Sequence, residues 1–212
     1  MILYGSPLSP FVRKVLAYAA EKGIELDLRA AGMGGGPPEF KLASPFGKMP
    51  GFKDGDFLIS DSTAIITYLE ALRPEPNLIP TEPRARARTI WFEEFGDTIV
   101  VGAAGAMFFN RLVAPKFLGR DGDEAAAANA EANLLPPVLE YLERTVPASG
   151  FLVEDRLTLA DLAVATGFVN LMHLGWTVQA ATHPKTAAYV AAILARPSFA
   201  TWVAQEKAMV GG

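Results

Sequence analysis

Residues 44–69, SPFGKMPGFKDGDFLISDSTAIITYL, decide how the first part of the chain folds. Within them, two short apolar runs, residues 51–53 and 57–59, stand on either side of Asp54-Gly55. An Asp-Gly pair supplies the positive φ that a tight hairpin turn requires. The stretch therefore predicts a β-hairpin.

A helix is expected directly after this hairpin. Asp61-Ser62 is a helix-capping sequence, and apolar residues at helical spacing follow it, namely Ala64, Ile65, Tyr68, Leu69 and Leu72. The first N–H groups of such a helix have no partner inside the helix, and together with the helix dipole they favour a bound carboxylate. We therefore expect an anion-binding helix end at Asp61 and Ser62.

Met49-Pro50 immediately precedes the hairpin. Proline is tolerated at the start of a strand, and a peptide bond before proline can be cis. In the cis form, the backbone N–H and C=O of Met49 can turn outward and pair with an extended peptide, as an added strand does. In the alternative interpretation, Pro50 is only a turn residue, and Asp61 and Ser62 only cap the helix.

The order Pro-x-Gly-Lys-x-Pro, Asp-Gly-Asp, Asp-Ser-x-Ala-Ile-x-x-Tyr-Leu resembles the glutathione-binding half of cytosolic glutathione S-transferases. In that family, the residue before a cis-proline pairs with the cysteinyl backbone of glutathione, and an acidic-Ser pair holds its γ-glutamyl end. The resemblance implies that Met49, Pro50, Asp61 and Ser62 bind glutathione, with Lys48 as a further contact.

Composition excludes several other classes of protein. The 212 residues, half of them apolar, are enough for one large domain or two small ones. A net charge of −4, with no basic cluster beyond Arg84, Arg86 and Arg88, argues against a nucleic-acid partner. The chain has no cysteine, which excludes disulfides, thiolate metal sites and a catalytic cysteine. His173 and His183 have no carboxylate at metal-ligand spacing, so no metal site is expected.

We also expect a cytoplasmic location and no membrane partner. The amino terminus, MILYGSPLSP, has neither a basic region nor a long apolar core, unlike a signal peptide. The most apolar internal run, residues 99–109, is too short to span a bilayer.

The rest of the first domain follows from short-range patterns. Residues 1–4 and 24–28 are expected to be strands, and a helix over residues 10–22 begins behind Ser9-Pro10. With a short helix near residues 38–42, the order becomes β-α-β-α-β-β-α, which is the α/β thioredoxin-like arrangement. We assign it to residues 1–75.

An all-α domain is expected to follow a proline-rich linker at residues 76–82. The domain covers residues 83–212, and its predicted helices lie near residues 83–113, 123–145, from 158 onward, 185–194 and 198–207. Thr158 and Asp161 form an acidic variant of the capping box, with Leu157 and Leu162 as a hydrophobic staple. The same box resembles a folding element of the family, so we give Thr158 and Asp161 a structural role.

Chemistry on glutathione requires its thiolate, because the anion is the nucleophile. A hydroxyl at a helix amino end can donate to the sulfur and lower its pKa, and Ser9 meets both conditions. The sequence from Ser9 to Val15 resembles the serine-type branches of the family, the tau-like and zeta-like ones, which makes Ser9 the expected catalytic residue. In the alternative, Ser9 only caps the helix. Tyr4 and Ser6 remain as other candidate hydroxyls.

In this family the electrophile lies between the two domains. The resemblance places Leu8 and Phe11 on one side, and Ala104, Phe108 and Arg111, which share one helical face, on the other. In the alternative, the aromatic residues belong to the core and Arg111 is a solvated or ion-paired surface residue.

The resemblance thus implies a glutathione S-transferase that directs the glutathione thiolate at a small apolar electrophile, as in detoxification, and acts as a homodimer. Two alternatives stay open: a glutathione-dependent peroxidase or isomerase, and a non-catalytic binding module with the same fold. The glycine-rich loop at residues 32–38 departs from the family pattern. It leaves no expected partner for the glycine carboxylate of glutathione.

Overall fold

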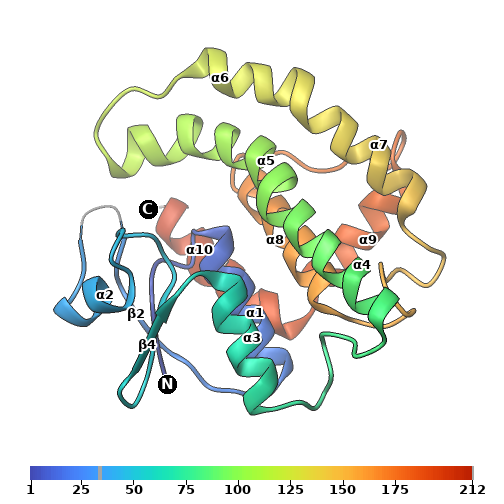
Figure 1. Cartoon of the computed structure of the whole chain (residues 1–212). Coiled ribbons are helices and arrows are strands. Elements are labelled where there is room, and N and C mark those ends of the chain that lie inside the picture. The colour runs from blue at the N-terminus through green and yellow to red at the C-terminus, as the bar shows by residue number, and fades with distance from the viewer. Residues whose placement is uncertain (33–34, 212) are drawn as a thin grey trace. The chain divides into compact units, whose positions relative to one another are not determined.

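The computed structural model describes residues 1–32 and 35–211. They form two compact units (Figure 1). The amino-terminal unit consists of residues 1–78 together with the last helix, and the helical unit consists of residues 79–196.

A mixed four-stranded sheet with the order β2-β1-β3-β4 organises the amino-terminal unit. Only the β1–β2 pair is parallel. The elements follow the order β1 (Ile2–Tyr4), α1 (Pro10–Glu21), β2 (Asp27–Arg29), α2 (Pro38–Ala43), β3 (Gly51–Asp54), β4 (Phe57–Ser60) and α3 (Ser62–Leu72). This is the predicted β-α-β-α-β-β-α order, so the thioredoxin-like arrangement is confirmed. Helices α1 and α3 pack side by side, and α2 packs against β3 and β4 (Figure 1).

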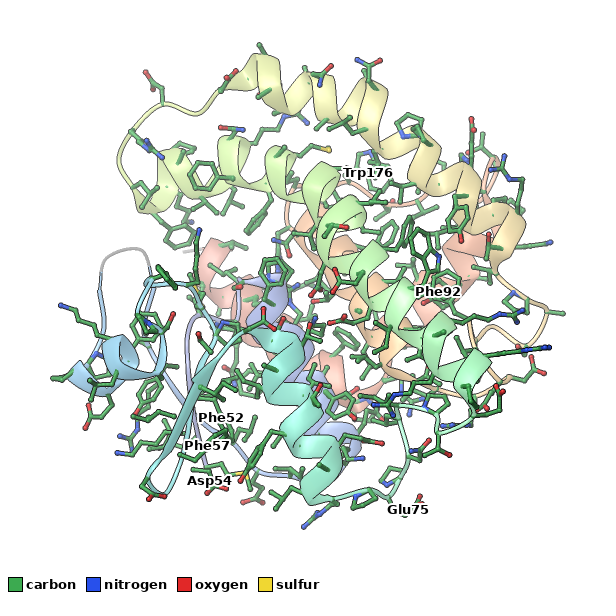
Figure 2. The ribbon with its side chains drawn as sticks, in the orientation of Figure 1. Phe52, Asp54, Phe57, Glu75, Phe92 and Trp176 are labelled. Carbon is green, nitrogen blue, oxygen red and sulfur yellow. The ribbon has the colours of Figure 1, made fainter. Side chains whose placement is uncertain are left out.

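The predicted hairpin is fixed to helix α3 by one aromatic side chain. The Tyr68 ring lies 5.7 Å from the ring of Phe52 and 4.9 Å from that of Phe57, measured between centroids. Its hydroxyl donates to Asp54 over 2.8 Å. Figure 2 labels the three hairpin residues. The hairpin end that leads into α3 is therefore held in one position relative to that helix.

Strand β2 begins three residues later than predicted. The reason lies at the end of α1, where the backbone N–H of Ile24 still donates to the C=O of Ala19, so the chain remains part of the helix cap. Pairing with β1 starts only at Asp27, opposite Ile2.

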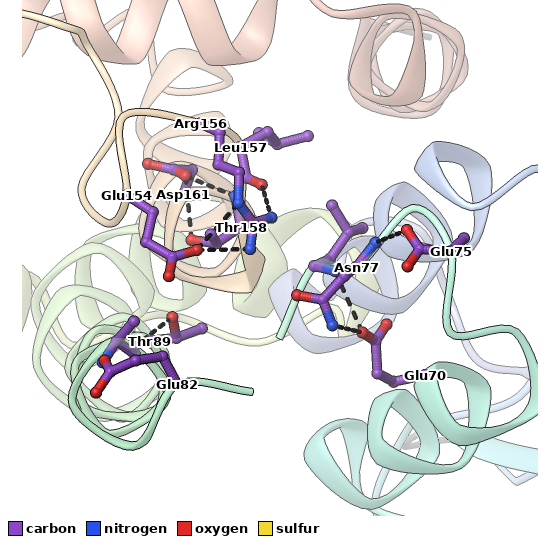
Figure 3. A network of polar contacts seen from close by, with 12 residues as sticks. Glu70, Glu75, Asn77, Glu82, Thr89, Glu154, Arg156, Leu157, Thr158 and Asp161 are labelled. Carbon is purple, nitrogen blue, oxygen red and sulfur yellow. Dashed lines mark hydrogen bonds and ion pairs between the residues drawn. The ribbon is translucent and has the colours of Figure 1, made fainter. Parts of the chain in front are cut away.

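The segment after α3 is tied back to the amino-terminal unit by Glu70. This carboxylate accepts hydrogen bonds from Tyr18 of α1 and from Lys22, which follows α1. It also accepts from the backbone N–H of Leu78 and from the side chain of Asn77, the contact drawn in Figure 3. Residues up to 78 therefore belong to this unit, whereas the sequence placed a linker at residues 76–82.

The last helix, α10 (Pro197–Gly211), also belongs to the amino-terminal unit, although the sequence analysis assigned it to the helical domain. It packs against α1, and its Phe199 and Val203 are buried. Its Glu206 forms a buried ion pair with Arg13 of α1. The sequence analysis expected the helical domain to extend to residue 212, whereas the compact helical unit ends at Arg196.

Two long helical stretches form one side of the helical unit. The first runs from Pro83 to Phe117 through α4 (Pro83–Glu94), the π-helical η1 (Phe95–Val100), α5 (Val101–Phe108) and the π-helical η2 (Phe109–Phe117). The second runs through α6 (Glu124–Asn129), the π-helical η3 (Ala130–Leu134) and α7 (Leu135–Thr145). Helices α8 (Leu159–Met172) and α9 (Pro184–Leu194) complete the unit, and the predicted helices are all present within a few residues.

The stretch Pro83–Phe117 is long and apolar enough to cross a membrane, judged by length and composition alone. A third of its most apolar window is buried inside the protein. Because core helices of soluble proteins pass the same test, the finding is weak support for a membrane span.

Helix α8 forms the core of the helical unit, since its residues from Leu159 to Leu171 are all buried. Two glycines allow it to approach the first long stretch closely. A Cβ atom added at Gly96 would lie 2.6 Å from the backbone oxygen of Ala163, and one added at Gly167 would lie 2.7 Å from a methyl group of Val100. Ordinary side chains at either position would push the helices apart.

Gly96→Ala is therefore expected to lower the free energy of unfolding by at least about 2 kcal/mol, because the added methyl group meets backbone that cannot move aside. The matched control is Gly102→Ala, an exposed position where an added Cβ meets nothing within 4 Å. It should leave stability unchanged or raise it by up to about 1 kcal/mol through helix propensity. Denaturant unfolding of both variants checks this, and equal effects would contradict the close packing.

Candidate active site

Three segments of the amino-terminal unit meet at one end of the sheet. In the strand register, Tyr4 of β1 lies opposite Gly51 of β3, and Gly51 lies opposite Ser60 of β4. The chain leaves β1 and β4, and enters β3, at this end. The loop after Tyr4, the residues before Gly51 and the residues after Ser60 are therefore neighbours, so the sheet brings together sequence features that lie far apart in the chain.

Two helix amino termini lie at the same end. Helix α1 begins at Pro10 after β1, and α3 begins at Ser62 after β4. The two helices pack against each other (Figure 1). Because the first N–H groups of a helix and its dipole both favour negative charge, this end of the unit suits an anionic ligand.

The Met49–Pro50 peptide bond is cis, as the sequence analysis anticipated. Among the described residues, no hydrogen bond engages the backbone N–H or C=O of Met49. An added Cβ at Gly5 would lie 3.5 Å from the Cβ of Met49, so the loop after β1 runs directly beside it. The side chain of Lys48 is exposed, and its backbone C=O accepts a hydrogen bond from Ser44 over 2.5 Å.

The glycine-rich loop approaches Met49 from another side. A Cβ atom added at Gly32 would lie 2.9 Å from the Met49 Cε. Gly32 and Gly35 exchange backbone hydrogen bonds of 2.8 and 2.9 Å. Met33 and Gly34 lie outside the described residues.

Asp61 is the N-cap of α3, as predicted, with its Oδ1 accepting from the N–H groups of Thr63 and Ala64 over 2.9 and 3.0 Å. Its φ of 82° is unusual for a residue other than glycine. Such a backbone costs roughly 1–3 kcal/mol, and residues in it cluster at functional sites. Asp61 is exposed, whereas Ser62 is buried at the first position of the helix.

Ser9 is the N-cap of α1, and its side chain is half-buried. Its Oγ accepts from the N–H of Val12 over 3.5 Å, the outer limit of a hydrogen bond, so this contact holds the hydroxyl only weakly. A hydroxyl that accepts can still donate its own hydrogen. Capping and donation to a thiolate are thus compatible at Ser9.

The other two candidate hydroxyls differ from Ser9 in their surroundings. Tyr4 is 1% exposed, its ring packs 6.4 Å from that of Phe40 in α2, and its hydroxyl has no partner among the described residues. Burial, followed by the charge of Glu39, raises the pKa of the Tyr4 phenol. The Tyr4 side chain is therefore packed in the core against α2, unlike the half-buried side chain of Ser9. Ser6 is half-buried, and its backbone C=O accepts from the N–H of Ser9 over 3.0 Å.

The residues expected at the second-substrate pocket lie in different units. In the amino-terminal unit Leu8 is buried and Phe11 is half-buried. In the helical unit Ala104 and Phe108 are buried, and Arg111 is paired through its guanidinium with two carboxylates.

The partners of Arg111 are Glu124, at 2.7 Å, and Glu131, at 2.6 Å. Hydrogen bonds to Glu124 and then to Glu131 raise the pKa of Arg111. The alternative interpretation of Arg111 as an ion-paired residue is therefore confirmed, and a role toward the second substrate stays a prediction.

Two buried cations of α1, Arg13 and Lys14, were missed by the sequence reasoning. Neither lies on the apolar face that the sequence predicts for this helix, yet both are buried because α1 is covered on all sides from Val12 to Ala19. The partner of Arg13, Glu206, is 193 positions away along the chain. In the sequence, the available signal was the position of two charged residues between apolar ones, and this position does not indicate which residue pairs with Arg13. Within residues 1–32 and 35–211, no cluster of three or more acidic or histidine side chains is placed to hold a metal ion.

Comparison with known proteins identifies the family. Residues 3–77 match the model of the glutathione S-transferase N-terminal domain, and residues 108–206 match that of the C-terminal domain. A glutathione S-transferase of Hyoscyamus muticus is 31% identical over 205 residues, which cover 94% of this chain and 95% of the relative. Glutathione S-transferase 3 of Zea mays is 30% identical over 211 residues, which cover 95% and 92%. The solved structure of a glutathione S-transferase from Rhodospirillum rubrum F11 superposes with a TM-score of 0.86 at 26% identity, covering 95% of this chain and 90% of that one.

The chain belongs to the glutathione S-transferase family, whose co-substrate is glutathione. The family resemblance of residues 44–69 and the expected fold class are thereby confirmed. The serine-type branch and the roles of individual site residues stay predictions.

Proposed function

We propose that this protein is a serine-type glutathione transferase, in which Ser9 donates a hydrogen bond to the glutathione sulfur and stabilises its thiolate. The observation that carries the proposal is the strand register, which places the Met49-Pro50 segment and the amino termini of α1 and α3 at one end of the sheet, with Ser9 as the cap of α1. Within residues 1–32 and 35–211, no hydrogen bond engages the backbone of Met49. A thiolate at this end receives both the hydroxyl and the helix dipole of α1.

The remaining contacts follow from the same arrangement. The N–H and C=O of Met49, held before Pro50, pair with the cysteinyl backbone of glutathione. Asp61 and Ser62 at the start of α3 hold the γ-glutamyl end, where the helix N–H groups favour its carboxylate and the Asp61 side chain favours its ammonium group. Lys48, exposed beside Met49, is a further contact.

The second substrate is a small apolar electrophile, and the serine-type assignment favours the tau-like and zeta-like branches. Leu8 and Phe11 are the proposed contacts from the amino-terminal unit, and Ala104, Phe108 and Arg111 those from the helical unit. A homodimer, a cytoplasmic location and a role in detoxification complete the proposal. Their support is membership of the family.

The proposal is tested by steady-state turnover with glutathione and three electrophile classes: an aryl halide, an α,β-unsaturated carbonyl and an organic hydroperoxide. Conjugation of either of the first two, above the uncatalysed rate, supports the transferase. Turnover of the hydroperoxide alone favours the peroxidase alternative. Glutathione binding without turnover of any class contradicts the proposal and favours a binding module.

A further inference from the structure

A fully buried ion pair joins the first helix of the chain to its last. The Arg13 Nε donates to Glu206 Oε1, and one of its terminal nitrogens donates to Oε2, both over 2.7 Å. Both side chains are 0% exposed. This two-pronged geometry is the strongest form of a charge-assisted hydrogen bond between side chains, and it fixes the orientation of both partners.

The pair lies one helical turn from Ser9. The backbone N–H of Arg13 donates to the C=O of Ser9 over 2.9 Å, which is the first hydrogen bond of α1. The cap bond of the Ser9 side chain is long, at 3.5 Å. The position of the Ser9 hydroxyl therefore depends on the first turn of α1 more than on its own cap bond.

A second polar contact joins the same two helices farther along. Ser198 Oγ donates to Glu21 at the carboxy-terminal end of α1 over 2.6 Å. Glu21 follows Arg13 by eight residues and Glu206 follows Ser198 by eight, so the helices run antiparallel with contacts roughly 12 Å apart. One contact acts near Ser9, and the other acts at the far end.

Stability alone does not explain a buried ion pair at this position. The loss of hydration of two buried charges offsets much of their attraction, and apolar residues of similar volume are often as stable. What the pair adds is a fixed register between α10 and the first turn of α1. We propose that Glu206 is a positioning residue, which holds the Ser9 hydroxyl in place for the glutathione thiol through Arg13. This inference rests on the proposed role of Ser9.

The central variant is Glu206→Gln, which keeps the shape of the side chain and removes its charge. The readout is the apparent pKa of the thiol of bound glutathione, followed by its ultraviolet absorbance against pH. Positioning predicts that this pKa rises by about one unit, because a displaced hydroxyl no longer stabilises the thiolate. A purely electrostatic role predicts the opposite sign, since the loss of the negative charge of Glu206 makes the surroundings of the site more positive and favours the thiolate. A lowered or unchanged thiol pKa overturns the proposal.

Two further variants separate positioning from general loosening. Ser198→Ala weakens the contact at the far end of α1 and should leave the thiol pKa as in wild type. The double variant Arg13→Met with Glu206→Leu keeps the helices packed without charge, and it should bring the thiol pKa back to within about 0.3 units of wild type. A rise of the thiol pKa in Ser198→Ala as large as in Glu206→Gln, or no recovery of the thiol pKa in the double variant, contradicts positioning.

If Glu206→Gln does not fold, Glu206→Asp is used in its place, since it keeps the charge but is too short to hold both Arg13 nitrogens.

The experiment also separates this inference from the proposed function. If the wild-type protein itself does not lower the thiol pKa, the role of Ser9 fails. If wild type lowers it and Ser9→Ala abolishes the effect, while Glu206→Gln leaves it unchanged, only the role of Glu206 fails.

Discussion

Replacing Ser9 with alanine is expected to lower turnover about 100- to 1000-fold while glutathione affinity stays within a factor of about three. In the proposed mechanism the hydroxyl donates to a charge that exists only on the thiolate, so its loss weakens the reactive form far more than the bound thiol. The contacts assigned to Met49, Asp61 and Ser62 remain in place. Single-turnover rates and calorimetric binding of glutathione measure the two quantities separately.

The control must account for the second role of Ser9 as a helix cap. Loss of an N-cap costs about 0.5–2 kcal/mol of stability, so the folded fraction of Ser9→Ala is measured by circular dichroism under assay conditions. Ser9→Thr keeps both hydroxyl and cap and should retain most of the turnover. Ser6→Ala removes the neighbouring hydroxyl and should leave turnover unchanged. A Ser9→Ala variant as active as wild type would remove Ser9 from the mechanism, and a large loss in Ser6→Ala would move the role to Ser6.

Asp161→Ala is expected to lower the free energy of unfolding by about 3–5 kcal/mol. The carboxylate is fully buried and accepts from the backbone N–H groups of Leu152 and Thr158, each over 2.9 Å. Figure 3 shows Thr158 beside it. It also accepts from the hydroxyl of Tyr189 over 3.4 Å. Alanine removes the acceptor of the buried N–H groups of Leu152 and Thr158 and opens the start of α8, the core helix of its unit. Denaturant unfolding measures the change.

The matched control is Asp123→Ala, which removes the exposed N-cap of α6. Among the described residues, the side chain of Asp123 accepts one hydrogen bond, from the N–H of Ala126 over 2.9 Å, so its loss should cost about 1 kcal/mol. Glutathione affinity per folded molecule should be unchanged in both variants. A changed affinity in folded Asp161→Ala, with unchanged stability, would contradict a structural role for this carboxylate.

The same carboxylate gives stability a pH dependence. Burial raises the pKa of Asp161 to about 6, although hydrogen bonds from Leu152 and Thr158 oppose the rise. A raised pKa means that the folded state holds the proton more tightly than the unfolded chain does. The tighter proton binding therefore stabilises the folded state below about pH 4, and this stabilisation is lost as pH rises through about 6. The loss in the free energy of unfolding is on the order of 2–3 kcal/mol. The free energy of unfolding of wild type minus that of Asp161→Asn should therefore fall by this amount between pH 4 and pH 7. A difference that rises over this range would contradict the raised pKa.

Sequence reasoning succeeds here where the determining contacts are local. The Asp54-Gly55 turn, the Asp61 cap and the box of Thr158 and Asp161 depend on residues at most a few positions apart, and the structure contains all three. The start of β2 was misjudged because the helix cap at Ile24 competes with strand pairing, and alternation alone does not show that competition.

Long-range pairs were not predictable in the same way. Nothing near Arg13 in the sequence indicates that a glutamate 193 positions later neutralises it. Likewise, the hydrogen bonds of Glu70 to α1 and to residues 77–78 decide where the amino-terminal unit ends, and no local pattern shows them. Contacts of the same long-range kind, between α10 and α1, place α10 in the amino-terminal unit. Hence the hairpin, the helix starts and the last helix were predictable from sequence, whereas the unit to which that last helix belongs was not.

The most direct test of the central claim is the ultraviolet absorbance of the glutathione thiolate in the wild-type complex, followed against pH. If Ser9 and the amino terminus of α1 stabilise the thiolate, its apparent pKa should fall to about 7 or below, against about 8.5 for a free thiol. The shift should disappear in Ser9→Ala. Glutathione that binds and titrates as it does free in solution would contradict thiol activation at this site.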